Sequence, residues 1–136
     1  MANKSKAKGT AAETKIVKFL KAAGLDARRV ALQGSKDAGD IYVVCQTDQV
    51  GITLEVKAGK QTQNVSRQQK EEWLNQTRVE GVNANTPSYL VIAKHGSAVK
   101  DYHVWSNTGR IFMYLDEFTK SLGGSVEEHK TSTECG

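Results

Sequence analysis

Apolar residues in the first part of the chain recur every three or four positions, which predicts an amphipathic helix from about Thr10 to Gly24. Thr10 and Glu13 have the spacing of a capping box at the start of this helix. Residues 25–32 alternate loosely between apolar and polar side chains, which predicts a short strand.

Two apolar runs follow, residues 41–45 and 52–57, and the second alternates strictly between apolar and polar side chains. The polar connection over residues 46–51 is typical of a hairpin, so we expect two antiparallel strands. Ser66 can then cap a helix that runs to about Val79.

The remaining apolar runs are short. Residues 89–93 predict a buried strand after the only proline, and a further pair of strands is expected around residues 103–105 and 111–113. A last helix is expected over residues 116–122. This order of elements predicts an α/β domain with a central mixed β-sheet flanked by helices.

The length of 136 residues and the 38% of apolar residues are enough for one domain. We expect a flexible basic arm over residues 1–9, a single domain over 10–122 and a disordered tail over 123–136. There is no apolar run long enough for a membrane span or a signal peptide. Cys45 and Cys135 indicate neither a disulfide framework nor a zinc site, so a cytosolic protein is expected.

Positive charge is concentrated near the N-terminus. Residues 1–30 hold eight basic and two acidic residues, a net charge of +6, whereas the whole chain carries +4. This end is therefore expected to face a polyanion, although such charges often serve solubility alone. The candidate phosphate contacts are Lys4, Lys6, Lys8, Arg28, Arg29 and Lys36.

Three side chains carry the candidate chemistry. The period of two over residues 52–57 places Glu55 and Lys57 on one face of their strand. Asp40 opens the preceding strand, so hairpin pairing can bring its carboxylate beside Glu55. Two carboxylates and phosphate oxygens are what Mg²⁺ prefers, which favours phosphodiester hydrolysis. A surface ion pair between Glu55 and Lys57 and a turn role for Asp40 are the simpler alternatives.

Gly39-Asp40, followed after fourteen residues by Glu55-Val56-Lys57, resembles the D…E-x-K signature of the PD-(D/E)XK nuclease superfamily, with Gly39 in place of the usual proline. The likeness extends over residues 8–92 and is closest to the archaeal and bacteriophage Holliday junction resolvases. The further segments that carry it are Lys8 to Glu13, Arg28-Arg29-Val30, Gly34-Ser35 and the glutamines of the second helix.

The resemblance implies a restriction-endonuclease-like core and a set of roles. Asp40, Glu55 and the carbonyl oxygen of Val56 would bind Mg²⁺, for which Mn²⁺ would substitute, and Glu13 would complete the metal site. Lys57 would be the catalytic lysine. A helix glutamine would assist, with Gln69 preferred to Gln68 because Trp73 lies one turn further on. Ser35 would contact the DNA backbone near the cut. Taken alone, Glu13 could equally interact with the helix dipole and Gln69 could be a surface residue.

These expectations combine into a magnesium-dependent, structure-selective DNA endonuclease that introduces paired nicks into a four-way junction. A homodimer is expected because such a junction is two-fold symmetric and needs one site on each of two strands. We expect it in the host-cell cytoplasm if a phage encodes it. The alternatives are a PD-(D/E)XK nuclease for flap, fork or duplex DNA, and a nucleic-acid-binding protein without chemistry.

Overall fold

A computed structural model describes residues 3–30 and 40–126 of the chain, and for residues 3–9 it describes the backbone alone. The elements, in chain order, are α1 (Asn3–Ala22), β1 (Ala27–Arg29), β2 (Ile41–Val44), β3 (Gly51–Lys57), a 3₁₀ turn (Lys60–Thr62), α2 (Arg67–Ala84), β4 (Ser88–Ile92), a 3₁₀ turn (Val99–Asp101), β5 (His103–Ser106), β6 (Phe112–Tyr114) and α3 (Leu115–Ser121).

The strands form one sheet in the order β1-β2-β3-β4-β5-β6. Neighbouring strands are antiparallel except β3 and β4, which are parallel and are connected through α2. The hairpin between β2 and β3 and the mixed sheet are therefore as the sequence predicts. A parallel pair needs a long crossover, and α2 provides it.

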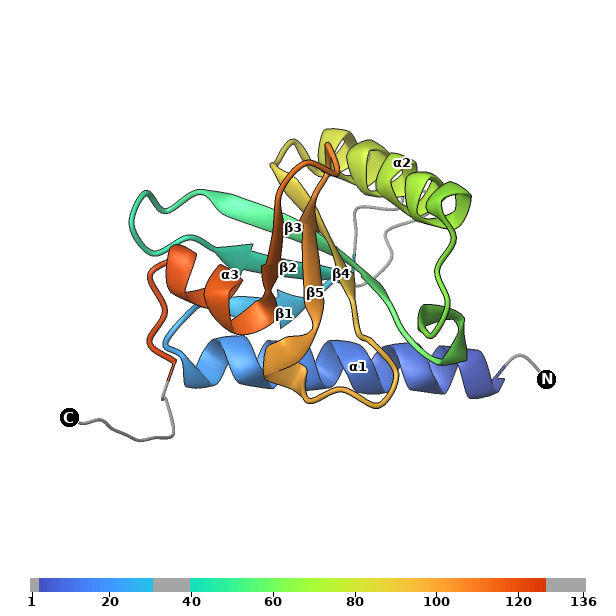
Figure 1. Cartoon of the computed structure of the whole chain (residues 1–136). Helices are drawn as coiled ribbons and strands as arrows, with labels where there is room; N and C mark the ends of the chain where they lie inside the picture. The colour runs from blue at the N-terminus through green and yellow to red at the C-terminus, as the bar shows by residue number, and fades with distance from the viewer. Residues whose placement is uncertain (1–2, 31–39, 127–136) are drawn as a thin grey trace.

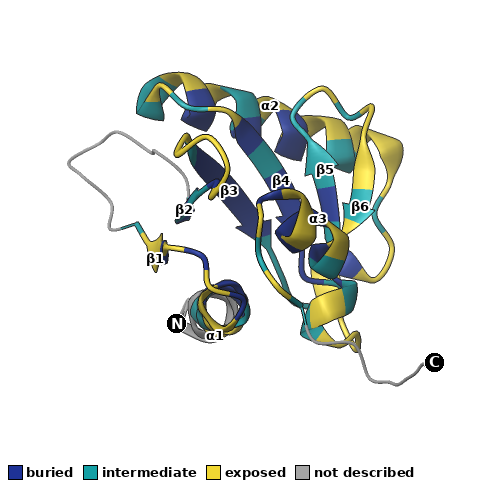
Figure 2. Ribbon diagram, turned by 90° about the vertical axis from the view of Figure 1, so that its left-hand side faces the viewer, coloured by how far each residue is buried: buried dark blue, intermediate teal, exposed yellow. Residues whose placement is uncertain are grey.

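Helices cover both faces of the sheet (Figure 1). The larger core lies between the sheet and α1 with α3, where Ile16, Leu20, Leu54 and Phe118 are almost fully buried. A smaller core lies under α2, built on Trp73, Leu74, Leu90 and Ile92. Figure 2 shows the buried positions gathered on β3 and β4 in the middle of the sheet, while β6 at its edge is more exposed. The central strand β3 is thus covered on both of its faces.

Helix α1 differs from its prediction. It begins at Asn3 and not near Thr10, so the predicted arm over residues 1–9 is helical from Asn3 onward. Thr10 accordingly lies inside the helix, where its carbonyl oxygen accepts a 2.9 Å hydrogen bond from Thr14 Oγ1, and it does not form a capping box with Glu13. The prediction failed because the sequence of residues 3–9 has no apolar periodicity, although its lysines and alanine are good helix formers.

Helix α2 begins as predicted, because the side chain of Ser66 accepts a hydrogen bond from the backbone N–H of Gln69. It continues past the predicted end at Val79 to Ala84 and stops at Asn85, whose φ of 58° is left-handed. The extra turn places Glu80 in the interior, where it is 1% exposed. Gly81 allows this turn to lie against Ser88, because a Cβ at Gly81 would lie 2.5 Å from Ser88 Oγ.

The start of the predicted disordered tail belongs to the folded structure. The N–H of Ser125 donates a 2.9 Å hydrogen bond to the carbonyl oxygen of Ala23, at the end of α1. Residues 127–136 lie outside the described residues. No helix in the described part of the chain combines the length and the apolar character needed to cross a membrane.

Candidate active site

The β2–β3 register brings Asp40 beside Glu55. Ile41 pairs with Leu54, so the next pair outward is Asp40 with Glu55. The N–H of Asp40 donates a 2.9 Å hydrogen bond to the carbonyl oxygen of Leu54, and Asp40 Oδ2 accepts a 2.8 Å hydrogen bond from the N–H of Val56. The two carboxylates therefore meet where β2 begins, as the hairpin predicts.

Glu55 is not a solvated surface residue. It is 4% exposed, because α2 covers the face of β3 that carries Glu55 and Lys57. Glu55 Oε2 lies 3.1 Å from Lys57 Nζ, whereas the buried Oε1 has no hydrogen-bond partner among the described residues. A buried carboxylate oxygen without a donor is costly unless a cation or a proton compensates it. The simple surface ion pair is therefore excluded.

The acidic groups perturb one another. Burial raises the pKa of Asp40 from 3.8 to about 8, the negative charges of Glu55 and Glu13 contribute to the rise, and the hydrogen bond from Val56 opposes it. Burial also raises the pKa of Glu13, against the lowering effect of Arg29. At neutral pH Asp40 therefore retains its proton, and a bound cation would replace that proton.

Glu13 reaches this region from α1 and is held by β1. Its Oε1 lies 3.1 Å from Arg29 Nε, and its side chain is 16% exposed. Arg29, a candidate phosphate contact, thus pairs with an acid at the edge of the site. Its neighbour Arg28 is exposed and lies over the ring of Tyr42, 5.0 Å from the centroid.

The donor set fits a hard divalent cation. Asp40 and Glu55 supply adjacent carboxylates, one of which has an unsatisfied buried oxygen. In a strand, the N–H and the C=O of one residue point to the same side. The N–H of Val56 points toward Asp40, so the carbonyl oxygen of Val56 points toward Asp40 as well. Within the described ranges, no three His, Cys, Asp or Glu side chains form a metal-binding group. Glu13 is therefore not placed as a third carboxylate ligand in this conformation. Mg²⁺ requires only one or two protein carboxylates, since water and substrate phosphate fill its other positions.

Lys57 is fixed by a chain of polar contacts under α2. Its Nζ donates a 2.8 Å hydrogen bond to Gln76 Oε1, and Gln76 Nε2 donates a 3.1 Å hydrogen bond to Glu80 Oε2. The carboxylate of the buried Glu80 accepts hydrogen bonds, so the N–H₂ end of the Gln76 amide faces Glu80 and its oxygen faces the lysine. The ammonium group is thus held between the carboxylate of Glu55 and the amide oxygen of Gln76.

Gln69, the glutamine preferred from the sequence, does not reach this chain of contacts. Its side chain donates a 3.3 Å hydrogen bond to Glu72 on the same helix. Gln76, and not Gln69, contacts Lys57, so the role of Gln69 stays a prediction that these contacts do not support. The spacing from Trp73 does not separate the two glutamines, because Gln69 lies four residues before this buried anchor and Gln76 lies three residues after it.

Several candidate residues lie outside the described part of the chain. Ser35 and Lys36 fall in the segment 31–39, and the side chains of Lys4, Lys6 and Lys8 are likewise not described.

Comparisons with known proteins agree with this fold. The family model described as "Phage putative PDDEXK endonuclease" matches residues 4–123. Among solved structures, Hjc of Archaeoglobus fulgidus, a Holliday junction resolvase from an archaeal hyperthermophile, superposes with a TM-score of 0.56 at 16% sequence identity. That match covers 82% of this chain and 95% of Hjc, so the predicted restriction-endonuclease-like fold is confirmed. No curated protein sequence matches the chain. With a family match over nearly its whole folded length, the chain belongs to the phage PD-(D/E)XK endonuclease family.

Proposed function

We propose that this nuclease is a magnesium-dependent, structure-selective DNA endonuclease that resolves four-way junctions by paired nicks. The observation that carries the hydrolytic assignment is the buried Asp40–Glu55 pair, with its unsatisfied oxygen and the ammonium of Lys57 beside it. The junction as substrate is supported by the fold shared with a Holliday junction resolvase.

The proposed ligands of the cation are Asp40, Glu55 and the carbonyl of Val56, with Glu13 as a further acid once DNA is bound. When bound, Mg²⁺ would polarise the scissile phosphate and make water a better nucleophile. Mn²⁺ would substitute, since it also prefers oxygen ligands.

Lys57 has a separate role. Glu55 Oε2 and Gln76 Oε1 occupy two directions around its Nζ, at 3.1 Å and 2.8 Å. An ammonium has three N–H donors, so one remains for a phosphate oxygen or for the attacking water. On a phosphate oxygen this donor would stabilise the negative charge that builds there, and on the attacking water it would orient that water. In either case Lys57 would act on the reacting groups directly.

The remaining proposals concern DNA binding and assembly. Lys4, Lys6, Lys8, Arg28, Ser35 and Lys36 are proposed to contact the DNA backbone, and Arg29 to contribute while it pairs with Glu13. A homodimer would place one site on each of two strands of a two-fold symmetric junction. The protein would act in the cytoplasm of the phage host.

The deciding experiment is cleavage of a labelled four-way junction with and without Mg²⁺, beside a fork, a flap and a linear duplex. Paired nicks in opposing strands of the junction, dependent on Mg²⁺, are expected. Cleavage of the fork, flap or duplex in preference would make the protein another kind of DNA nuclease. Binding without any cleavage would leave it a nucleic-acid-binding protein, and Asp40→Asn serves as the inactive control.

A further inference from the structure

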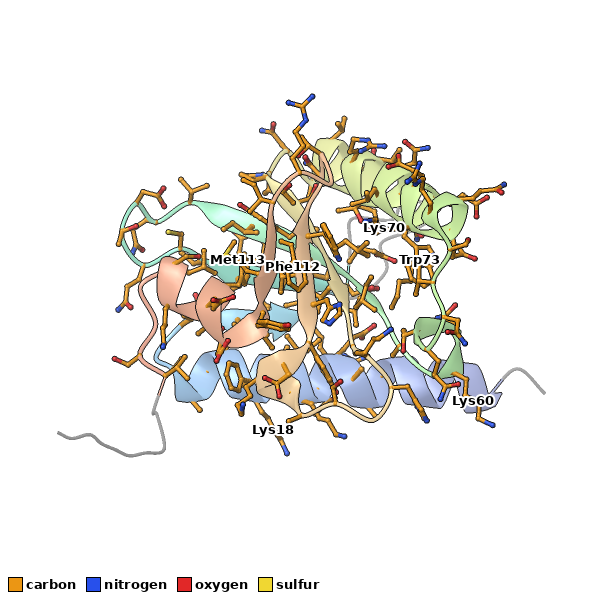
Figure 3. The ribbon with its side chains drawn as sticks, in the orientation of Figure 1. Lys18, Lys60, Lys70, Trp73, Phe112 and Met113 are labelled. Carbon is orange, nitrogen blue, oxygen red and sulfur yellow. The ribbon has the colours of Figure 1, made fainter. Side chains whose placement is uncertain are left out.

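A positively charged pocket of about 250 Å³ lies beside the candidate active site, between the start of α2 and strands β4 and β5. Its cationic side chains are Arg67 and Lys70 on α2 and Lys94 just after β4, and its floor includes Ile92, His103 and Trp105. We call these six residues the α2 pocket. Figure 3 shows Lys70 under α2, on the same helix as Trp73.

The two lysines of the α2 pocket are held in place but not neutralised. Lys94 Nζ donates hydrogen bonds of 2.8 and 3.1 Å to the carbonyl oxygens of Thr62 and Gln63. Lys70 Nζ lies 3.8 Å from the centroid of the Trp105 ring. In the described part of the chain, neither these two lysines nor Arg67 forms an ion pair with a carboxylate. The pocket therefore presents uncompensated positive charge to a ligand.

This charge is placed where it does not help the helix. Arg67 opens α2 and Lys70 follows one turn later, while the first turn contains no acidic residue. Cations near a helix N-terminus are unfavourable because the helix dipole is positive there. An anion bound in the α2 pocket would relieve this repulsion.

The position of the pocket links it to the proposed reaction. Lys57 pairs with Ile92 on β4, and Ile92 pairs with His103 on β5. Since adjacent strands are about 4.8 Å apart, His103 lies roughly 10 Å from Lys57 on the face of the sheet that α2 covers. Consecutive phosphates of one strand are farther apart than the axial rise of roughly 3.4 Å per nucleotide, because the backbone winds around the helix axis. The separation therefore corresponds to one or two nucleotides.

We propose that the α2 pocket binds a backbone phosphate of the DNA strand whose scissile phosphate lies at Lys57, one or two nucleotides from the cut. The inference rests on the proposed function, because it assigns a second contact on the same substrate strand. The pocket is suited to phosphate and not to a stacked base, since Lys70 covers one face of Trp105 and Phe112 packs against its ring, with the centroids 4.8 Å apart. Such a contact carries no sequence information, which is consistent with the proposed recognition of DNA shape.

The experiment compares the wild type with the double variant Arg67→Gln/Lys70→Gln. Affinity for a labelled linear duplex and for a four-way junction is measured over a salt series in EDTA, so that no cleavage is needed. The slope of log affinity against log salt should flatten by roughly 0.9 for each phosphate that the variant no longer binds. In Mg²⁺, the variant should show a raised KM with kcat nearly unchanged, because a contact away from the reacting atoms contributes uniform binding.

The matched control is Lys18→Gln/Lys21→Gln, which removes the same charge from exposed positions on α1. Lys18 points away from the sheet on the far side of the molecule from Lys70 (Figure 3). This control should keep the wild-type slope. Arg67→Gln alone provides a second variant that leaves the contact between Lys70 and Trp105 intact, and thermal unfolding verifies that each variant is folded.

The outcomes separate the two proposals. An unchanged slope in the α2-pocket variants, an equal flattening in the α1 control, or the absence of DNA binding by the wild type would overturn the phosphate subsite. A flattened slope confined to the α2-pocket variants supports it, even if no junction is cleaved. In that last case the proposed junction-resolving activity fails while the DNA contact stands.

Discussion

The backbone N–H of Val56 donates a 2.8 Å hydrogen bond to Asp40 Oδ2, so the first acid of the site is anchored to the middle residue of the E-x-K triplet. The contact fixes the Asp40 carboxylate beside Glu55 and lowers the pKa of Asp40, against the larger effect of burial. An asparagine at position 40 keeps an acceptor oxygen for this hydrogen bond and loses only the charge. Asp40→Asn is therefore a clean test of the electrostatic role of the site.

Asp40→Asn and Glu55→Gln should each lower junction cleavage in Mg²⁺ by several orders of magnitude, because each removes a proposed ligand of the cation. Affinity for the junction in EDTA should change less than about tenfold, since the basic surface remains. Gel-based cleavage and binding assays on the same preparations measure both. Wild-type cleavage by Asp40→Asn would show that Asp40 is not part of the metal site.

The raised pKa of Asp40 predicts how metal-free stability depends on pH. Its pKa is about 8 in the folded protein against 3.8 ordinarily, so between these values the folded state binds more protons than the unfolded state. Stability should therefore fall as pH rises from about 4 to 8 in EDTA. Asp40→Asn should flatten this dependence, and the difference between the two proteins cancels the opposing contribution of His103, whose pKa is lowered.

Thermal unfolding over that pH range, with and without Mg²⁺, measures the effect. Stabilisation of the wild type by Mg²⁺ should grow toward pH 8, because the cation competes with the proton on Asp40. The same pH slope in wild type and Asp40→Asn would mean that Asp40 is ionised in the folded protein throughout.

Lys57→Ala should reduce kcat by several orders of magnitude with little change in DNA affinity, because its free N–H donor acts on the reacting groups. Lys57→Arg should also be poor, since a planar guanidinium does not fit the space between Glu55 Oε2 and Gln76 Oε1 in the same way. Single-turnover cleavage at saturating enzyme isolates the chemical step. A fully active Lys57→Ala enzyme would reduce the lysine to an ion-pair partner of Glu55.

The meeting of Asp40 and Glu55 was predictable because it is a local property. Strand alternation and a short hairpin connection set the β2–β3 register, and the register sets which residues stand opposite. The burial of Glu55 was not predictable in this way. Alternation assigns Glu55 to a face of β3, but only the packing of Trp73 and Leu74 on Leu90 and Ile92 places α2 over that face.

The same limit explains the two differences between the predicted and the observed helices. The start of α1 could not be predicted because residues 3–9 have no apolar periodicity to reveal their helix. The glutamine that accepts the hydrogen bond from Lys57 could not be assigned from the sequence, because the choice depends on how far α2 extends along the sheet. Once Gln76 is known to contact Lys57, Glu80 follows from helical spacing.

Gln76→Ala and Gln69→Ala form a matched pair that separates the structural assignment from the sequence-based one. Both changes remove one glutamine side chain from α2, but only Gln76 accepts the hydrogen bond from Lys57 Nζ. Without that acceptor the ammonium loses one of its two anchors, and a displacement of about 1 Å can lower a rate by roughly a hundredfold. We expect kcat for junction cleavage to fall by about ten- to a hundredfold in Gln76→Ala, with KM nearly constant, while Gln69→Ala retains wild-type values.

Glu80→Gln should give a smaller loss of kcat, since it frees the Gln76 amide to turn its N–H₂ toward Lys57 without removing the side chain. Equal losses in Gln76→Ala and Gln69→Ala, with unchanged unfolding temperatures, would mean that the polar chain from Lys57 to Glu80 does not position the lysine for the reaction.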